Sequence, residues 1–579
     1  MTNDQFNIAQ YLPAMARSAP NRTAVLCPHR ADDRGRTSLT FHELDQDSDQ
    51  YAAGLSRLGL RAGQRTLLMV RPGLDFIALT FALFKAGAVP VLIDPGMGRT
   101  NLLSCIRQVR PEAMVAVPLA HAVRVLLAPG AFDAVRLFVT VGRRWFWGGS
   151  TLRHVRRLGQ DGLPFPMAAT ARGSAAAILF TSGGTGIPKG VVYEHGMFDA
   201  QLAVIRDVYG IQPGEVDLPA FPLFALFSTA LGTTCVIPDM DPTRPAQCDP
   251  AKIVRAIREH SVTYTFGSPA IWKHVGPYCI ENNITLPGVK RILIAGAPVR
   301  GEVLAPFVQI LGPDADTYIP YGATEALPVA SIRGSEVLGE TWPLTRQGRG
   351  YCVGRPVPGI TVRIIRPDDA PLSPVGRGAG GEGDSLPLWN ESLVLPQGEI
   401  GEIAVKGPVV TREYYDMPEQ TRAAKLNEPL PGAPACVWHR MGDMGYLDDN
   451  GRLWFCGRKA HRVIMEGGKA LYSVCVEALC EEAYERLCGV RPRAALVGLG
   501  APGQQRPVIV FEYNTPGGQL PLVRGLHAAL SAYEMTRNLF KILYCPTFPV
   551  DVRHNAKINR EALAHWAQSK IENRKSKIT

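Results

Sequence analysis

The stretch that decides the fold is Phe180 to His195, which reads FTSGGTGIPKGVVYEH. Its glycines can adopt positive φ angles, so that backbone N–H groups approach an anion closely. Hydroxyl donors and one lysine add further partners for phosphate oxygens. These phosphate-binding candidates are Thr181, Ser182, Gly183, Gly184, Thr185, Gly186 and Lys189.

This loop differs from the phosphate loop of P-loop nucleotidases. That motif needs G-x-x-x-x-G-K-[ST] at the start of a helix. Here Lys189 is followed by Gly190, and the residues VVYEH indicate a strand. We therefore expect a hairpin whose tip binds phosphate, with a plain hairpin turn as the alternative.

Around the hairpin, short apolar strands alternate with helical patterns. Segments 66–70, 175–180, 264–268 and 291–296 indicate buried strands, and Phe41 to Leu58 has helical spacing. Such alternation predicts a parallel sheet that is covered on both faces. After a Gly- and Pro-rich stretch at 366–398, which indicates a long loop, EIAVKG and RLWFCG indicate antiparallel strands.

Bulk properties fit an enzyme with several domains. The 579 residues exceed what one core holds, and the net charge of +10 is mild for this length. No secretory signal or membrane-spanning segment is expected, and the twelve cysteines form no CxxC pair. Together these features predict a cytoplasmic protein, with no nucleic acid as its partner.

One stretch stands apart from this ordinary composition. Residues 141–157, VGRRWFWGGSTLRHVRR, interleave arginines with Trp145, Phe146 and Trp147. A solvated face with aromatics packed beneath it is one interpretation. A docking surface for a protein partner or a membrane is the other.

The glycine-rich hairpin resembles the T-S-G-x-T-G-x-P-K-G motif of the adenylate-forming superfamily, which includes acyl-CoA synthetases, peptide-synthetase adenylation domains and luciferases. That resemblance implies an α/β fold with a large N-terminal domain of αβαβα-layered sheets and a β-barrel-like subdomain. It also implies a small, mobile α+β C-terminal domain. We expect the domains to be residues 1–457 and 458–579.

Further motifs follow in the order of that family and imply ATP and Mg²⁺ as its cofactors. AGAPV (295–299) and YGATE (321–325) are similar to the adenine and α-phosphate segments, and EYYDMPEQT (413–421) also fits. The resemblance places Glu325 on Mg²⁺, Thr324 on the α-phosphate, and Asp443 on the ribose hydroxyls. The remaining nucleotide-binding residues that it implies are Gly296, Ala297, Pro298, Tyr321, Gly322 and Arg458.

The chemistry explains why cations gather in such a site. A carboxylate must attack the α-phosphate of ATP, so two anions have to meet. The positive charge of Lys557, with Mg²⁺ on Glu325, can stabilise the charge that develops there. Lys557 lies in VDVRHNAKINRE, which keeps the K-I-x-R half of the family motif and replaces the other half by Arg553 to Ala556.

A second departure lies at Phe221 to Phe227, FPLFALF, where acyl-CoA synthetases often read PLFH. Ala225 takes the place of that histidine. We expect a long alkyl pocket here, with a core segment as the alternative. The expected pocket residues are Phe221, Phe224, Ala225 and Phe227.

Together these departures resemble the β-lactone synthetases of bacterial long-chain olefin and hydrocarbon biosynthesis. That branch implies adenylation of a long-chain 2-alkyl-3-hydroxy fatty acid, followed by closure of the β-hydroxyl onto the acyl-AMP. It further implies assembly with a thiolase, a reductase and a lactone decarboxylase. The group that assists closure stays open among His195, His439, His461 and His554.

Two other functions remain open from the sequence. A long-chain acyl-CoA or acyl-carrier ligase shares the first half-reaction. A catalytically silent scaffold is the other, and the presence of Glu325, Asp443 and Lys557 argues against it.

Overall fold

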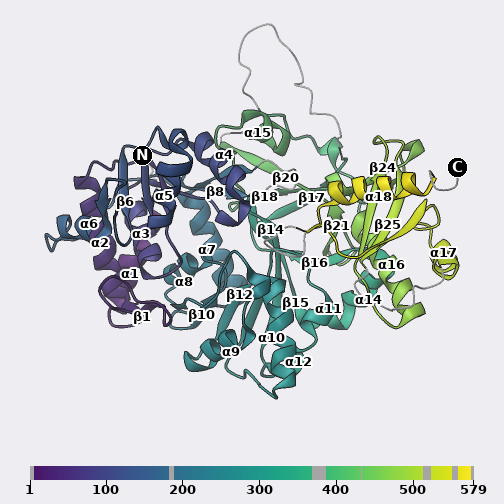
Figure 1. The fold of residues 1–579 in the computed structure, drawn as a ribbon, viewed down its shortest axis with the longest axis horizontal. Helices are drawn as coiled ribbons and strands as arrows, with labels where there is room; N and C mark the ends of the chain where they lie inside the picture. Colours follow the sequence, from purple (N-terminus) through teal and green to yellow (C-terminus); the bar gives the residue numbers. More distant parts are fainter. Residues whose placement is uncertain are drawn as a thin grey trace, which may run out of the picture.

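The computed structural model describes residues 5–181, 188–367, 386–431, 433–512, 523–550 and 558–575. A large N-terminal body carries two extended sheets, and a smaller C-terminal unit lies at one end of it (Figure 1). The loop predicted at 366–398 falls partly outside these ranges. Within them, no helix has both the length and the apolar character that crossing a bilayer requires.

The sheet that carries the glycine-rich hairpin has the order β7-β6-β5-β3-β4-β8-β9. All neighbours are parallel except β8 and β9, which pair antiparallel with Thr181 opposite Lys189. The strands are β3 (Arg65–Met69), β4 (Val89–Leu92), β5 (Ala113–Ala116), β6 (Leu137–Thr140), β7 (Ser150–Thr151), β8 (Ala175–Thr181) and β9 (Lys189–Glu194). The predicted hairpin is therefore confirmed on both sides of its tip.

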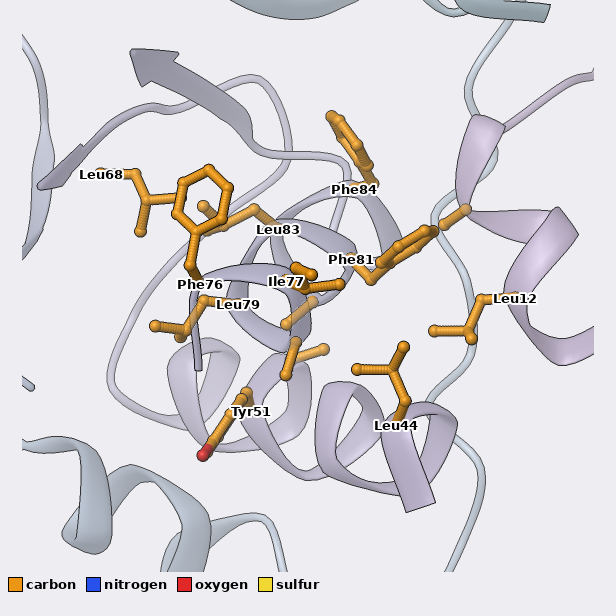
Figure 2. Close-up of a cluster of buried hydrophobic side chains, with 14 of the residues drawn as sticks. Leu12, Leu44, Tyr51, Leu68, Phe76, Ile77, Leu79, Phe81, Leu83 and Phe84 are labelled. Carbon is orange, nitrogen blue, oxygen red and sulfur yellow. The ribbon is translucent and has the colours of Figure 1, made fainter. Parts of the chain in front are cut away.

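Helix α3 (Leu74–Lys85) packs against one side of this sheet and is buried over nearly its whole circumference. It lies beside α2 (Phe41–Arg57) in a cluster that also includes Leu12 of α1 (Tyr11–Ser18) (Figure 2). A helix that is apolar all round needs cover on every side, which these neighbours provide. The Thr40 side chain and Glu43 form a capping box that begins α2.

The second sheet is larger and joins parallel to antiparallel strands. Its parallel part contains β1 (Thr23–Leu26), β10 (Val216–Pro219), β11 (Thr234–Val236), β12 (Tyr264–Gly267), β13 (Arg291–Ile294) and β14 (Asp316–Ala323), with β2 (Ser38–Thr40) antiparallel at its edge. Its antiparallel part contains β15 (Ala326–Arg333), β16 (Tyr351–Pro356), β17 (Thr361–Ile365), β18 (Gly401–Lys406), β19 (Lys425–Leu430), β20 (Ala433–Leu447) and β21 (Leu453–Arg458). The antiparallel strands predicted from EIAVKG and RLWFCG are β18 and β21.

Helices flank both sheets, as the alternating pattern predicts. The longer ones of the N-terminal body are α4 (Arg99–Val109), α5 (Pro118–Leu127), α6 (Leu152–Leu158), α7 (His195–Tyr209), α8 (Phe224–Ala230), α9 (Pro250–Glu259) and α10 (Pro269–Glu281). The layered α/β fold class expected from the resemblance is confirmed.

The C-terminal unit combines β24 (Ala494–Leu499), β25 (Arg506–Glu512) and β26 (Lys541–Cys545) with α16 (Ser473–Cys488), α17 (Val523–Ser531) and α18 (Arg560–Lys575). Helix α17 ends at Ser531, and turns follow it. The boundary between residues 457 and 458 stays a prediction. Arg458 is the last residue of β21.

Helix α16 holds the C-terminal unit against the N-terminal body through charged pairs. Arg300 binds Glu481, and Arg346 binds Glu482 and Glu485 with N–O distances of 2.6 and 3.0 Å. Arg491, from the C-terminal unit itself, contacts the same three glutamates. Arginine side chains from both units therefore contact the glutamates of α16.

Candidate active site

A cleft of about 3020 Å³ extends between the two sheets and reaches the C-terminal unit. The described nucleotide-binding candidates all line it: Thr181, Lys189, Gly296, Ala297, Pro298, Tyr321, Gly322, Thr324, Glu325, Asp443 and Arg458. Ser182, Gly183, Gly184, Thr185 and Lys557 lie outside the described residues. Val550 and Ile558, the described residues on either side of the segment that contains Lys557, also line the cleft.

The segment predicted to contact adenine follows strand β13 directly. Ligands of parallel α/β sheets gather at the carboxyl ends of the strands, where this segment lies. The Ala295 N–H donates to the carbonyl of Gly267 at 3.1 Å, and Gly296 has a φ of +97°. This turn bends the chain along the wall of the cleft.

Asp443 is the centre of a hydrogen-bonded network. The Tyr321 hydroxyl donates to its Oδ2 at 2.7 Å, and Arg458 Nη1 lies 3.0 Å from its Oδ1. Asp443 and Arg458 are opposite each other in the pairing of β20 with β21. Burial and the Asp443 charge raise the pKa of Tyr321, and that charge also raises the pKa of Arg458. The network therefore fixes a buried carboxylate in one orientation.

Thr324 and Glu325 occupy the tight turn between β14 and β15. A Cβ on Gly322 would lie 2.5 Å from the carbonyl oxygen of Ala326, so only glycine fits this turn. The Tyr193 hydroxyl, from β9, donates to the Thr324 carbonyl. The turn is thereby tied to the strand that follows the glycine-rich hairpin.

Tyr414 holds the carboxylate of Glu325. Its hydroxyl donates to Oε1 at 2.7 Å, while the Tyr414 backbone forms a bridge to Val191 of β9. Lys189 Nζ lies 4.8 Å from the Tyr414 ring centroid. Burial and the Glu325 charge raise the pKa of Tyr414, which keeps its hydroxyl a donor. The region around EYYDMPEQT thus orients the predicted metal ligand.

Lys425 lies behind this group and is fully buried. Its ammonium donates to the Thr411 carbonyl and, at 3.2 Å, to the Thr411 hydroxyl. Burial lowers the pKa of Lys425 to about 7, although the nearby Glu325 charge opposes that shift. Lys425 and the role of Tyr414 were not predicted from the sequence, because both residues act through partners that are distant in sequence.

The described histidine candidates differ in their surroundings. His195 accepts the Ile8 N–H at 3.2 Å and has a structural role. His439 and His461 line the cleft, and burial lowers the pKa of both, that of His461 to about 3. Within the described part of the chain, Nδ1 of His439 has no hydrogen-bond partner. His554 lies outside that part.

The other end of the cleft is apolar. Phe221, Phe224 and Phe227 line it, and Phe224 stacks on Phe266 with ring centroids 3.5 Å apart. Further apolar side chains on this wall come from Phe84, Phe198, Leu202, Leu223, Leu226 and Ala230.

Ala225 does not belong to this wall. Its side chain is buried in the hydrophobic core on the inner side of α8, and it is not among the described residues that line the cleft. The prediction for Ala225 is therefore corrected. Helix α8 begins only at Phe224. Phe224 and Phe227, three residues apart, share the side of the helix that faces the cleft, whereas Ala225 lies on another side.

The fold and this polar network define a class. A family model described as AMP-binding enzyme matches residues 12–383, and the chain belongs to that family. The structure is similar to that of the amide bond synthetase McbA from Marinactinospora thermotolerans, with a TM-score of 0.74 and 22% identity. That comparison covers 96% of this chain and 99% of the other, and it supports the fold alone.

Within the family, the similarity narrows to one branch. The chain is 46% identical to the olefin beta-lactone synthetase of Stenotrophomonas maltophilia (strain K279a), over 99% of this chain and 100% of that protein. It is 45% identical to the olefin beta-lactone synthetase of Xanthomonas campestris pv. campestris, over 97% of both chains. The resemblance inferred from the motifs is thereby confirmed.

Proposed function

We propose that this chain is an ATP-dependent olefin β-lactone synthetase that acts on a long-chain 2-alkyl-3-hydroxy fatty acid. The observation that carries the proposal is the near full-length similarity to two olefin beta-lactone synthetases. The cleft supports it, because a polar end suited to a nucleotide adjoins an apolar end suited to alkyl chains.

In the first half-reaction, a carboxylate oxygen of the acid bonds to the α-phosphorus of ATP, and pyrophosphate leaves. Lys189 and the glycine-rich hairpin bind the departing phosphates, and Thr324 contacts the α-phosphate. Tyr321 and Arg458 keep Asp443 oriented for the ribose hydroxyls. Lys557 supplies positive charge at the reacting phosphate.

In the second half-reaction, the β-hydroxyl oxygen bonds to the acyl carbon, and AMP leaves. One proton is lost from that hydroxyl, and the product is a cis-β-lactone. The reacting groups belong to one molecule, so no thiol acceptor is needed. Phe221, Phe224 and Phe227 bind an alkyl chain of the acyl-adenylate and keep water away from it.

Mg²⁺ fits the residues at the phosphate end. This ion usually keeps several waters and takes one or two protein carboxylates beside substrate phosphates. Glu325 would supply that carboxylate, oriented by Tyr414. The ion would offset the negative charge of the phosphates. We further propose a cytoplasmic location and assembly with the thiolase, reductase and lactone decarboxylase of the pathway.

The test is product formation in the absence of coenzyme A. Purified protein is incubated with ATP, MgCl₂ and a racemic long-chain 2-alkyl-3-hydroxy acid, and products are extracted and identified by NMR. A β-lactone and AMP are expected. The matched control is the 2-alkyl acid without the 3-hydroxyl, which should be adenylated and give no lactone. Product only after addition of coenzyme A, as a thioester, would contradict the proposal and favour an acyl-CoA ligase.

A further inference from the structure

Exposed apolar side chains gather on one part of the N-terminal body. Of fifteen strongly exposed large apolar residues in the described chain, six fall within a stretch of 28 residues. They are Leu119, Val125, Leu126, Leu127, Trp145 and Phe146. Single exposed apolar residues are ordinary, whereas a group of this size marks an interaction site.

Four of these residues belong to α5, whose exposed side is apolar. Leu119 is 70% exposed and Leu126 is 65% exposed, while Ala120 and His121 are buried on the inner side. The one charged residue of the helix, Arg124, turns its guanidinium onto the Phe138 ring, 3.9 Å from its centroid. The outward side of α5 therefore presents no charge to the solvent.

The other two residues sit on a loop that is fixed to α5. Trp147 is buried and stacks on His121 with centroids 5.9 Å apart, and its carbonyl accepts from Arg124 Nη2 at 2.8 Å. Trp145 and Phe146 pack on Trp147, at centroid distances of 5.8 and 5.4 Å. They are nevertheless 63% and 64% exposed. The loop holds two aromatic rings outward on a rigid base.

The surrounding sequence is strongly basic. Residues 118–160 contain seven arginines and one aspartate, with no lysine or glutamate, in a chain whose total net charge is +10. Arg143 and Arg144 immediately precede Trp145, and both are exposed. An excess of arginine beside exposed tryptophan complements the negative surface of an anionic bilayer.

We propose that these residues form a docking patch for an anionic lipid surface. The α5 patch consists of Leu119, Val125, Leu126, Leu127, Arg143, Arg144, Trp145 and Phe146. Its apolar side chains enter the boundary between headgroups and acyl chains, while Arg143 and Arg144 bind headgroup phosphates.

The patch is continuous with the cleft. Leu119 belongs to the patch and also lines the cleft, together with Ala120 and Val123 of the same helix. A substrate with long alkyl chains partitions into lipid rather than water, so that a docked enzyme would meet it there. This step rests on the proposed function, whereas the docking itself does not.

A lipid surface fits the patch better than a protein partner does. Protein interfaces carry about one hydrogen bond per 100–200 Å². The outward side chains of α5, namely Leu119, Val125, Leu126 and Leu127, have no polar atom with which to form one. The acyl region of a bilayer offers no hydrogen-bond partners, so apolar side chains can enter it without forming hydrogen bonds.

The experiment measures sedimentation of the full chain with vesicles, without ATP or hydroxy acid. Vesicles of phosphatidylcholine with about 30 mol% phosphatidylglycerol are compared with phosphatidylcholine alone. The wild-type protein should bind the anionic vesicles about tenfold more tightly, and salt should weaken that binding. Because no reaction is followed, failure here is distinct from failure of the proposed function.

Two double variants test the patch, each with a matched control. Trp145→Ser with Phe146→Ser should weaken binding to anionic vesicles about tenfold or more, whereas Val308→Ser with Val490→Ser, two exposed apolar positions elsewhere, should not. Arg143→Gln with Arg144→Gln should weaken binding and reduce its salt dependence. Arg255→Gln with Arg258→Gln, on the exposed side of α9, is its control. ATP–pyrophosphate exchange at the wild-type rate confirms that each variant is folded.

Three results would overturn the proposal. One is the absence of wild-type binding to anionic vesicles at low salt, and another is equal loss of binding in the test and control variants. The third is a patch that serves a protein instead: wild-type chains self-associate or bind a purified pathway enzyme through Trp145 and Phe146, but do not bind vesicles.

Discussion

The nucleotide end and the acyl end of the cleft are held together by different kinds of contact. At the nucleotide end, Asp443 and Glu325 are each held by a tyrosine hydroxyl at 2.7 Å, and Arg458 adds a charged contact to Asp443. At the acyl end, the walls meet through ring contacts such as that of Phe224 with Phe266.

This difference indicates that the two ends of the cleft serve different purposes. Directional hydrogen bonds fix charged groups where charge develops, which adenylation requires. Apolar contacts have little direction and define mainly volume and dryness. We infer that the nucleotide end carries the chemistry shared across the family, and that the acyl end decides which acid is used.

The largest expected effect comes from Lys557, to which the motif resemblance assigns a role at the reacting phosphate. Lys557→Ala should slow adenylation about a hundredfold, since one charged contact in the transition state contributes roughly 3 kcal/mol. The rate of ATP–pyrophosphate exchange measures it. Lys570→Ala, on α18, is the matched control. Exchange at the wild-type rate by the Lys557 variant would contradict the role assigned to Lys557.

A smaller effect is expected at the ribose network. Asp443→Ala should raise the KM for ATP about thirtyfold, because a hydrogen bond to a charged group contributes roughly 2 kcal/mol. Tyr321→Phe, which leaves the carboxylate in place, should raise it less. Initial-rate kinetics at varied ATP will rank the two variants, and the reverse order would contradict the central position of Asp443.

Loss of the hydroxyl at Tyr414 should act through Glu325. Tyr414→Phe keeps the ring beside Lys189 and removes one hydrogen bond, a change of about 1 kcal/mol. The Mg²⁺ concentration for half-maximal adenylation should rise about fivefold, and kcat at saturating Mg²⁺ should change little. Tyr415→Phe is the neighbouring control. An unchanged Mg²⁺ requirement would show that Glu325 needs no support.

The smallest effect is expected at the acyl end. Phe227→Ala should lower kcat/KM for a long-chain acid about fourfold and leave that for a short-chain acid unchanged, because roughly 0.8 kcal/mol is lost when one buried methylene loses its contact. Ala225→Gly, on the core side of α8, should not discriminate by chain length. Equal effects of Phe227→Ala on both acids would remove the distinction between the two ends.

The nucleotide end was the more predictable of the two from sequence. Its residues lie in short motifs such as YGATE, where one turn places Thr324 and Glu325 together. The roles of Tyr414 and Lys425 were not predicted, because each residue contacts a partner that is distant from it in sequence. Tyr414 contacts Glu325, and Lys425 contacts Thr411. No local pattern encodes such contacts.

The apolar composition of the acyl end was predictable from the sequence, but the direction in which each side chain points was not. FPLFALF indicates an apolar segment, yet the orientation of α8 decides that Phe227 lines the cleft while Ala225 enters the core. The sheet alternation around the hairpin predicts the layered fold correctly, since apolar strands of this length need cover on both faces.

The arginine–glutamate contacts of α16 have a consequence for turnover. We propose that the C-terminal unit moves between the half-reactions, as the resemblance of the sequence motifs implies. Arg300 and Arg346 would then release Glu481, Glu482 and Glu485 in every cycle. Arg346 and Glu485 are each about one-third exposed, and an ion pair at such a site is weak and is screened by salt. We therefore expect the ionic strength of the surroundings to influence how readily these contacts between the C-terminal unit and the N-terminal body separate.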